Sequence, residues 1–154
     1  MFNKEPQKIN PNDSGIDFSK SVLACGDNNN SKFSLFSDHS IKTKEEPCFL
    51  VHTNQDTHSV INKKIGTSAM FSGKINAIGP RYCPSIEDKV FRFKERTSHH
   101  LFLEPEWSNS NQIYVNGFST SLPEKTQIEA LKTIPGLECV ELIRPGYAIE
   151  YDYV

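Results

Sequence analysis

Apolar positions along this chain follow two different periods, which separate expected strands from expected helices. An unbroken apolar run follows a charged loop and ends at His52, and apolar residues alternate with polar ones near the C-terminal end. Both patterns are typical of strands. The turn Trp107-Ser108-Asn109-Ser110 separates two further apolar runs, which predicts a hairpin. The expected strands are 32–36, 47–52, 101–104, 112–118, 139–144 and 147–153.

Three segments have helical spacing and recognisable start signals. Thr53 or Asn54 can cap a helix over Gln55–Lys64, and Pro84-Ser85 precedes one over 85–94. Ser121-x-x-Glu124 reads as a capping box that opens a third helix, which stops near Ile134 before Pro135-Gly136. The order of elements predicts an α+β fold, with a mixed sheet and a few short helices.

The helix after Pro84 has an apolar face and a basic face. Ile86, Val90 and Phe93 share the spacing of a core face. The other face carries Ser85, Lys89, Arg92 and Arg96.

Cys83 lies just before this helix, at the end where the helix dipole favours a thiolate and anions. Two plainer readings stay open. Cys83 can be a buried, inert thiol, and the basic face can be a solvated surface paired with Glu87, Asp88 and Glu95.

Length and charge describe one ordinary domain. The chain has 154 residues and a formal net charge of −2, which gives no overall attraction to nucleic acid. All four arginines lie in the second half, three of them near Cys83, so a local basic patch is expected. No apolar run reaches the roughly 18 residues of a membrane span, and no signal peptide is visible.

The cysteines and histidines match no metal or disulfide pattern. The four cysteines form no C-x-x-C pair, which favours a reducing compartment. Cys48, His52 and His58 lie close in sequence, but their spacing fits no standard zinc site. We therefore expect no metal.

Several motifs resemble one family in wording and in order. The run Gly79-Pro80-Arg81-Tyr82-Cys83-Pro84-Ser85-Ile86-Glu87-Asp88-Lys89 resembles the signature of the MnmG/GidA flavoproteins, which modify the wobble uridine of tRNA. The resemblance extends from about Gly15 to Val154 and includes the segments Cys48-Phe49-Leu50-Val51-His52-Thr53-Asn54, Leu101-Phe102-Leu103-Glu104-Pro105-Glu106, Asn116-Gly117-Phe118-Ser119-Thr120-Ser121-Leu122-Pro123 and Arg144-Pro145-Gly146-Tyr147-Ala148-Ile149-Glu150-Tyr151-Asp152.

The resemblance implies a specific activity. FAD is reduced by NADH, and a one-carbon unit from methylenetetrahydrofolate reaches carbon five of the wobble uridine of tRNA. It also implies an MnmE-type GTPase partner, a homodimer, and a cytoplasmic location, or an organellar one in a eukaryote. Cys83 would be catalytic, and Ser119, Thr120 and Ser121 would line the flavin side or simply cap a helix. The implied cofactor-binding residues are Gly79, Pro80, Arg81, Tyr82, Cys83, Pro84, Ser85, Ile86, Glu87, Asp88, Lys89, Val90, Phe91, Arg92 and Phe93.

The chain lacks a feature that the resemblance would require of a complete flavoprotein. No Gly-x-Gly-x-x-Gly fingerprint for a flavin pyrophosphate is present. We therefore expect an internal piece of the enzyme that holds no FAD alone, from a truncated gene or a split enzyme. The expected parts are a loose leader (1–14), an insertion-type α/β segment (15–78), and the signature with a return to the FAD-binding domain (79–154). A non-catalytic binding module with the same fold is the alternative.

Overall fold

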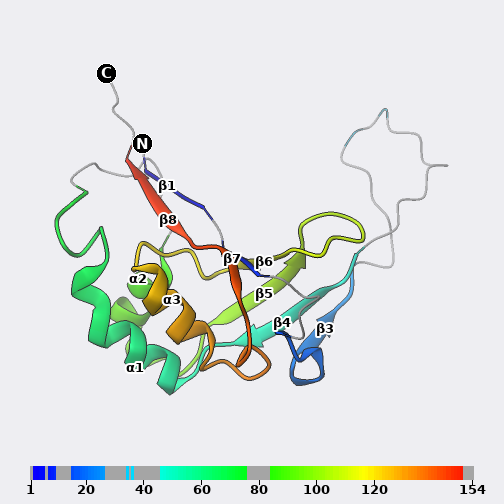
Figure 1. The fold of residues 1–154 in the computed structure, drawn as a ribbon, viewed down its shortest axis with the longest axis horizontal. Helices are drawn as coiled ribbons and strands as arrows, with labels where there is room; N and C mark the ends of the chain where they lie inside the picture. Colours follow the sequence, from blue (N-terminus) through cyan, green and yellow to red (C-terminus); the bar gives the residue numbers. More distant parts are fainter. Residues whose placement is uncertain are drawn as a thin grey trace.

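The structure is a computed structural model that describes residues 2–5, 7–9, 15–26, 34, 36, 46–75 and 84–150. Within this part of the chain, sheet strands and short helices alternate, so the predicted α+β class is confirmed (Figure 1). The strands are β1 (Phe2–Glu5), β2 (Gln7–Ile9), β3 (Val22–Ala24), β4 (Cys48–His52), β5 (His100–Pro105), β6 (Ile113–Asn116), β7 (Leu142–Arg144) and β8 (Tyr147–Glu150). The α-helices are α1 (Gln55–Lys64), α2 (Ile86–Arg92) and α3 (Glu124–Leu131), with short 3₁₀ turns η1 (Phe18–Lys20) and η2 (Ile65–Thr67).

The strands form one large and one small antiparallel sheet. The six-stranded sheet has the order β3-β4-β5-β6-β2-β7, and β1 pairs with β8 in a separate ribbon. The predicted hairpin of β5 and β6 is confirmed, with Leu103 opposite Val115. Val51 lies opposite Leu101 in the neighbouring pair, so these side chains share one face of the sheet.

The apolar face of the sheet and the helices together make the core. Figure 1 shows the three helices gathered on one side of the sheet. The buried apolar residues come from β4, β5, β6, the helices and the turns around them: Val51, Ile61, Ile86, Val90, Leu101, Leu103, Ile113, Val115, Phe118, Leu122, Ala130, Leu131, Ile134, Leu137 and Val140. Their removal from water is the main stabilising contribution to this arrangement.

Helix α1 has the bounds that its sequence predicts. The Asn54 side chain accepts a hydrogen bond from the Thr57 backbone N–H at 2.9 Å. In return, the Thr57 hydroxyl accepts one from the Asn54 backbone N–H. Asn54 Nδ2 also donates to the Thr133 carbonyl at 2.7 Å. The cap therefore joins the start of α1 to the chain just after α3.

Residues 2–5 and 7–9, which lie within the leader expected to be loose, are paired in sheets. Strand β1 pairs with β8, and β2 lies between β6 and β7. Strand pairing uses backbone N–H and C=O groups, which a polar segment offers as well as an apolar one. Composition alone therefore could not reveal these strands.

A correction concerns the strand expected over 32–36. Of that range the structure describes Ser34 and Phe36, which lie in a bend and a turn. The Phe36 N–H donates to the Ser34 hydroxyl at 3.2 Å. Such local side-chain bonds compete with strand pairing.

The strand expected over 139–144 begins later than its apolar pattern suggested, as β7 at Leu142. Val140 donates its N–H to the Leu137 carbonyl at 3.2 Å, so the chain is still turning there. Residues 151–153 of the last expected strand lie outside the described residues.

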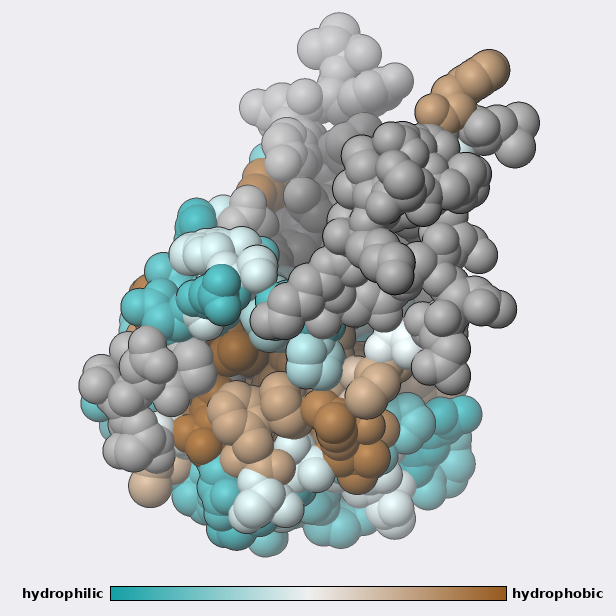
Figure 2. Space-filling model, turned by 90° about the vertical axis from the view of Figure 1, so that its right-hand side faces the viewer, coloured by the Kyte–Doolittle hydropathy of each residue, from teal (hydrophilic) through white to brown (hydrophobic). Residues whose placement is uncertain are grey.

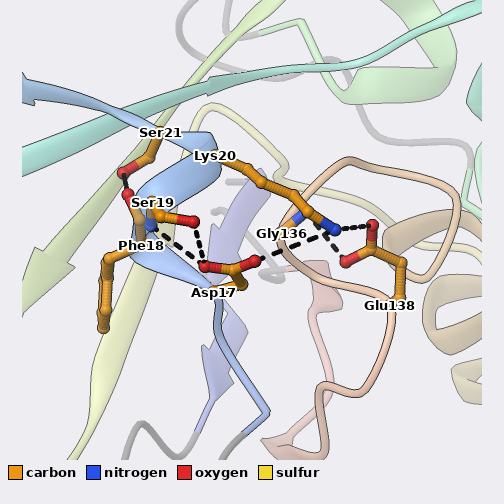
Figure 3. A network of polar contacts seen from close by, with 7 residues as sticks. All are labelled: Asp17, Phe18, Ser19, Lys20, Ser21, Gly136 and Glu138. Atoms are coloured by element: carbon orange, nitrogen blue, oxygen red, sulfur yellow. Dashed lines mark hydrogen bonds and ion pairs between the residues drawn. The ribbon is translucent and has the colours of Figure 1, made fainter.

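A polar network joins the segment around η1 to the turn after α3 (Figure 3). Lys20 Nζ contacts a Glu138 carboxylate oxygen at 2.9 Å and lies 3.8 Å from Asp17. The Asp17 N–H donates to the Gly136 carbonyl at 2.8 Å, and the Gly136 N–H donates to Glu138 at 2.9 Å. The hydrogen bond with Glu138 is the main reason that the pKa of Lys20 is raised.

The end strand β3 leaves apolar side chains in solvent. Val22 is 61% exposed and Leu23 is 54% exposed. Figure 2 views the molecule from the side on which β3 lies in Figure 1, and hydrophobic side chains gather there among hydrophilic ones.

In the part of the chain that the structure describes, no helix is long and apolar enough to cross a membrane.

Candidate functional site around helix α2

Helix α2 starts where the sequence predicts, because its cap is doubly satisfied. The Asp88 N–H donates to the Ser85 hydroxyl at 3.2 Å, and the Ser85 N–H donates to Asp88 Oδ2 at 3.2 Å. This reciprocal capping box fixes the direction in which the chain enters the helix from Pro84. The predicted Gly79–Cys83 part of the site, including Arg81 and the candidate nucleophile Cys83, lies outside the described residues.

The apolar face of α2 is shorter than its spacing suggested. Ile86 and Val90 are buried in the core as predicted. Phe93 was expected beside them but is 38% exposed. The helix ends at Arg92, and Phe93 takes the non-helical C-cap conformation with φ −113° and ψ 56°, so it leaves the core face.

Glu87 is a fully buried carboxylate, not the solvated partner of a basic face. Its Oε1 accepts hydrogen bonds from the Ser68 hydroxyl at 3.0 Å, the Ser121 N–H at 2.9 Å and the Ser121 hydroxyl at 3.0 Å. The two hydroxyl oxygens lie 2.6 Å apart. Oε2 is buried and has no hydrogen-bond partner among the described residues. The Glu87 cluster (Ser68, Glu87 and Ser121) thus holds α2 against two other segments of the chain.

Hydrogen bonds connect the segment Ser119–Ser121 to the start of α2. The Ser119 carbonyl accepts the Ile86 N–H at 2.8 Å, and the Thr120 hydroxyl accepts the Leu122 N–H at 3.1 Å. The capping box predicted for Ser121 is wrong, because α3 has Pro123 at its N-cap and no side-chain cap. Glu87 holds the Ser121 hydroxyl instead. No local pattern could show this, since the two residues are far apart in sequence.

The first turn of α2 offers fewer open donors than the sequence suggested. The Ile86 N–H is bonded to Ser119 and the Asp88 N–H to Ser85. The Glu87 and Asp88 carboxylates are both buried at this end. Two of the N–H groups at the helix start are thus already bonded, and two carboxylates lie beside them.

Buried histidines lie behind α2. The His99 N–H donates to the Thr53 hydroxyl at 2.9 Å, and that hydroxyl contacts His58 Nε2 at 2.9 Å. The two imidazole rings lie 5.3 Å apart. Burial lowers the pKa of His58, and burial together with the charges of His58 and Lys89 lowers the pKa of His99 to about 4. Both rings are neutral near pH 7.

These histidines do not form a metal site with their neighbours. Across the described ranges, no group of three or more His, Cys, Asp or Glu side chains could hold a metal ion. His52 and His100 contact each other edge to face at 4.7 Å, across the β4–β5 pair.

Three cysteines are described, and none is in a disulfide. Cys48 is half-buried in β4. Its pKa is raised, mainly by burial and to a smaller extent by the charge of Glu104. Cys25 is exposed. Cys139 is the first residue of the strand expected over 139–144, but it lies in a turn and is exposed.

Comparison with known proteins agrees with this architecture. The structure matches "Structure of Aquifex aeolicus GidA in the form I crystal" with a TM-score of 0.80 and 40% identity, over 96% of this chain and 26% of that chain. The form II crystal of the same protein matches with a TM-score of 0.76 and 36% identity, over 96% of this chain and 24% of that chain.

An antiparallel sheet backed by three short helices, one of them doubly capped and held by a buried glutamate, defines an α+β protein that corresponds to part of GidA. The chain belongs to the family described as glucose inhibited division protein A, whose family model matches residues 8–154. The match begins earlier than the expected Gly15 and includes the last two residues of β2, Lys8 and Ile9.

Curated relatives with clear sequence similarity share one description. "tRNA uridine 5-carboxymethylaminomethyl modification enzyme MnmG" from Chlorobium chlorochromatii is 53% identical over 138 residues. The protein of the same description from Chlorobium phaeovibrioides is 57% identical over 139 residues. Each match covers 90% of this chain and 22% of the relative, so the chain spans about a fifth of the length of these proteins.

Proposed function

We propose that this chain is part of a flavoenzyme that adds a carboxymethylaminomethyl group to carbon five of the wobble uridine in tRNA. The observation that carries the proposal is family membership over residues 8–154, together with relatives above 50% identity that bear this description. The resemblance adds FAD, NADH and methylenetetrahydrofolate, an MnmE-type GTPase, a homodimer and a cytoplasmic location to the proposal.

The fit of the implied cofactors to this chain is partial. The sequence has no glycine fingerprint for a flavin pyrophosphate. Ser85, Ile86, Glu87, Asp88 and Val90 are buried and serve capping or packing, so their predicted cofactor contacts would be indirect. We derive no step through FAD from the residues of this chain.

The proposed ligand-contacting residues lie on both sides of this buried turn in the sequence. The run before it, Gly79, Pro80, Arg81, Tyr82 and Cys83, lies outside the described residues. On the other side, Phe91, Arg92 and Phe93 are exposed. Lys89 donates from Nζ to the Gly117 carbonyl at 3.0 Å, which holds that ammonium near β6. Arg81, Lys89 and Arg92 supply the positive charge that phosphate or a developing oxyanion needs.

Cys83 has a chemically reasonable role in this proposal. A thiolate that adds to carbon six of uridine forms a sulfur–carbon bond and pushes the electron pair onto the carbonyl at carbon four. The resulting enolate is nucleophilic at carbon five, where the one-carbon unit is attached. Loss of the carbon-five proton and expulsion of the thiolate then restore the ring. General acid or base action by Cys83 is the alternative role.

A cellular experiment tests the function. We expect a strain without this gene to lack the 5-carboxymethylaminomethyl group in its tRNA, as measured by nucleoside mass spectrometry. The wild-type gene should restore the group, and Cys83→Ser should not, although the change is nearly isosteric. The matched control is Cys139→Ser, at an exposed thiol remote from the signature, which should restore modification fully. Unchanged modification in the deletion strain would reject the proposal and favour the non-catalytic binding module.

A further inference from the structure

Three phenylalanines lie in solvent beside cationic side chains, around the exposed end of α2. Phe71 is 37% exposed, Phe91 is 46% exposed and Phe93 is 38% exposed. Lys94 and Arg96 follow directly and are exposed as well. These five residues form what we call the aromatic–basic surface. None of the five belongs to the buried core, and exposed rings of this size mark a candidate contact surface.

The rings and cations are in direct contact. The Phe71 and Phe91 rings meet edge to face, with centroids 5.5 Å apart. Lys94 Nζ lies 4.8 Å from the Phe91 centroid, and Arg96 Cζ lies 5.7 Å from the Phe93 centroid. A pocket of about 290 Å³ lies beside these two rings, and its lining consists of Met70, Phe71, Asp88, Phe91 and Arg92.

The charge of this region differs from that of the whole chain. Residues 91–96 carry three cations and the single carboxylate of Glu95, whereas the chain has a net charge of −2. Aromatic faces with adjacent cations favour a partner that offers planar rings and negative charge in alternation. Unpaired nucleotides have this chemistry, whereas the bases of a duplex are stacked and out of reach of the rings.

We propose that the aromatic–basic surface binds unpaired nucleotides of RNA, with bases stacked on Phe71 and Phe91 and phosphates paired with Lys94 and Arg96. The inference rests on the proposed function and adds the place where the RNA is contacted. A base stacked on a ring is a stronger contact than an exposed cation over the same ring. The base therefore displaces the cation from the ring face, and the cation is left within reach of the neighbouring phosphate.

Fluorescence anisotropy with the full 154-residue chain tests the proposal. The probe is a labelled RNA hairpin with a seven-nucleotide loop, and a fully paired RNA of the same length is the comparison. We expect the hairpin to bind more tightly. Phe71→Ala/Phe91→Ala should weaken hairpin binding at least tenfold, because two stacking contacts are lost. Lys94→Ala/Arg96→Ala should reduce the slope of log affinity against log salt by about 1.4, for two phosphate contacts on a single strand.

Matched variants separate this surface from general effects. Phe102→Ala/Trp107→Ala removes two other exposed aromatic rings, 37% and 53% exposed, and should leave binding unchanged. Lys125→Ala/Lys132→Ala removes two exposed cations of α3 and its C-cap and should leave the salt slope unchanged. Phe91→Leu keeps an apolar side chain but no ring, so it should weaken binding even if an alanine variant unfolds.

Each contrary outcome overturns the inference. Equal binding of hairpin and duplex would show that no bases are stacked. Equal effects of the two aromatic pairs would show that the surface is not specific. A dimer in sedimentation that Phe71→Ala/Phe91→Ala abolishes would show that a second copy of the chain covers the surface. None of these results alters the tRNA modification assay, so failure here is distinct from failure of the proposed function.

Discussion

At the scale of single residues, His99 is the clearest case of an environment that changes chemistry. Its side chain is 8% exposed, and its Nε2 is buried without a hydrogen-bond partner in the part of the chain that the structure describes. Burial, helped by the nearby charges of His58 and Lys89, lowers its pKa from the usual 6.5 to about 4. The unfolded chain therefore binds this proton more readily than the folded chain does.

This shift predicts a loss of stability in acid. Above about pH 6.5 His99 is neutral in the folded and the unfolded chain, and the free energy of unfolding is not reduced. As the pH falls toward 4, the unfolded chain takes up the proton first, and the free energy of unfolding decreases by at most about 3 kcal/mol. Urea unfolding between pH 7 and pH 4 measures it. His99→Gln should flatten the decline, whereas His100→Gln, at the exposed neighbour, should not. Parallel declines in all three proteins would contradict the assignment.

The burial of the cysteines shows how far the environment of a single residue can be predicted from the sequence. Cys48 sits in an apolar run that is a strand, so its half-buried state and raised pKa could be predicted. Cys139 begins a similar apolar run, yet it is exposed. There the backbone turns with hydrogen bonds from Leu137 to Ile134 and from Val140 to Leu137. In such a turn one apolar residue can face the core while its neighbour faces solvent. The spacing of apolar residues in the sequence does not distinguish this pattern from a strand.

At the scale of elements, the position of α2 depends on Glu87. Glu87→Ala should cost about 3 kcal/mol of unfolding free energy, because the Ser68 and Ser121 hydroxyls and the Ser121 N–H lose their acceptor in a buried place. Glu87→Gln keeps one carbonyl acceptor and should cost less, about 1 kcal/mol. Urea unfolding gives the totals, and hydrogen exchange in α2 shows whether the helix loosens first.

Glu124→Ala is the matched control for this prediction. If Ser121 and Glu124 formed the capping box that their spacing suggested, the change would cost about 1 kcal/mol. With Ser121 bonded to Glu87 and Glu124 exposed, we expect less than about 0.5 kcal/mol. A cost for Glu124→Ala as large as that for Glu87→Ala would contradict the structure.

The helices show why local signals succeed or fail. Asn54 and its partner Thr57 are three residues apart, so the sequence alone defines the start of α1, and Ser85 with Asp88 does the same for α2. The hydroxyl of Ser121 has a tertiary partner that outcompetes the local one. The anchoring of the candidate site thus could not be read from its motif, although the motif itself could.

At the scale of the whole molecule, Gly136 joins distant parts of the chain. Its φ is +91°, and a Cβ there would lie 2.7 Å from the Asp17 carbonyl oxygen. Gly136→Ala should therefore combine backbone strain with a collision against the segment around η1, at a total of about 3 kcal/mol. Thermal unfolding measures the loss.

Gly73→Ala is the natural comparison for this change. Its φ is +72°, but no atom of the described residues lies within 4 Å of the added Cβ. It should cost only the backbone strain, about 1 kcal/mol. Equal costs at the two glycines would show that the approach of Asp17 to Gly136 is not tight.

The placement of β2 has a consequence for the order of events after synthesis. This strand ends at Ile9, yet its two neighbours, β6 and β7, begin only at Ile113 and Leu142 and are therefore made much later. At about 5–20 residues per second, the gap lasts on the order of 10 s on the ribosome. During that time the middle of the sheet cannot close, whatever has formed around it. Such distant pairings also slow folding once the chain is complete. Until β6 and β7 have been made, this part of the nascent protein can hold only local hairpins and helices, and β2 joins the sheet after them.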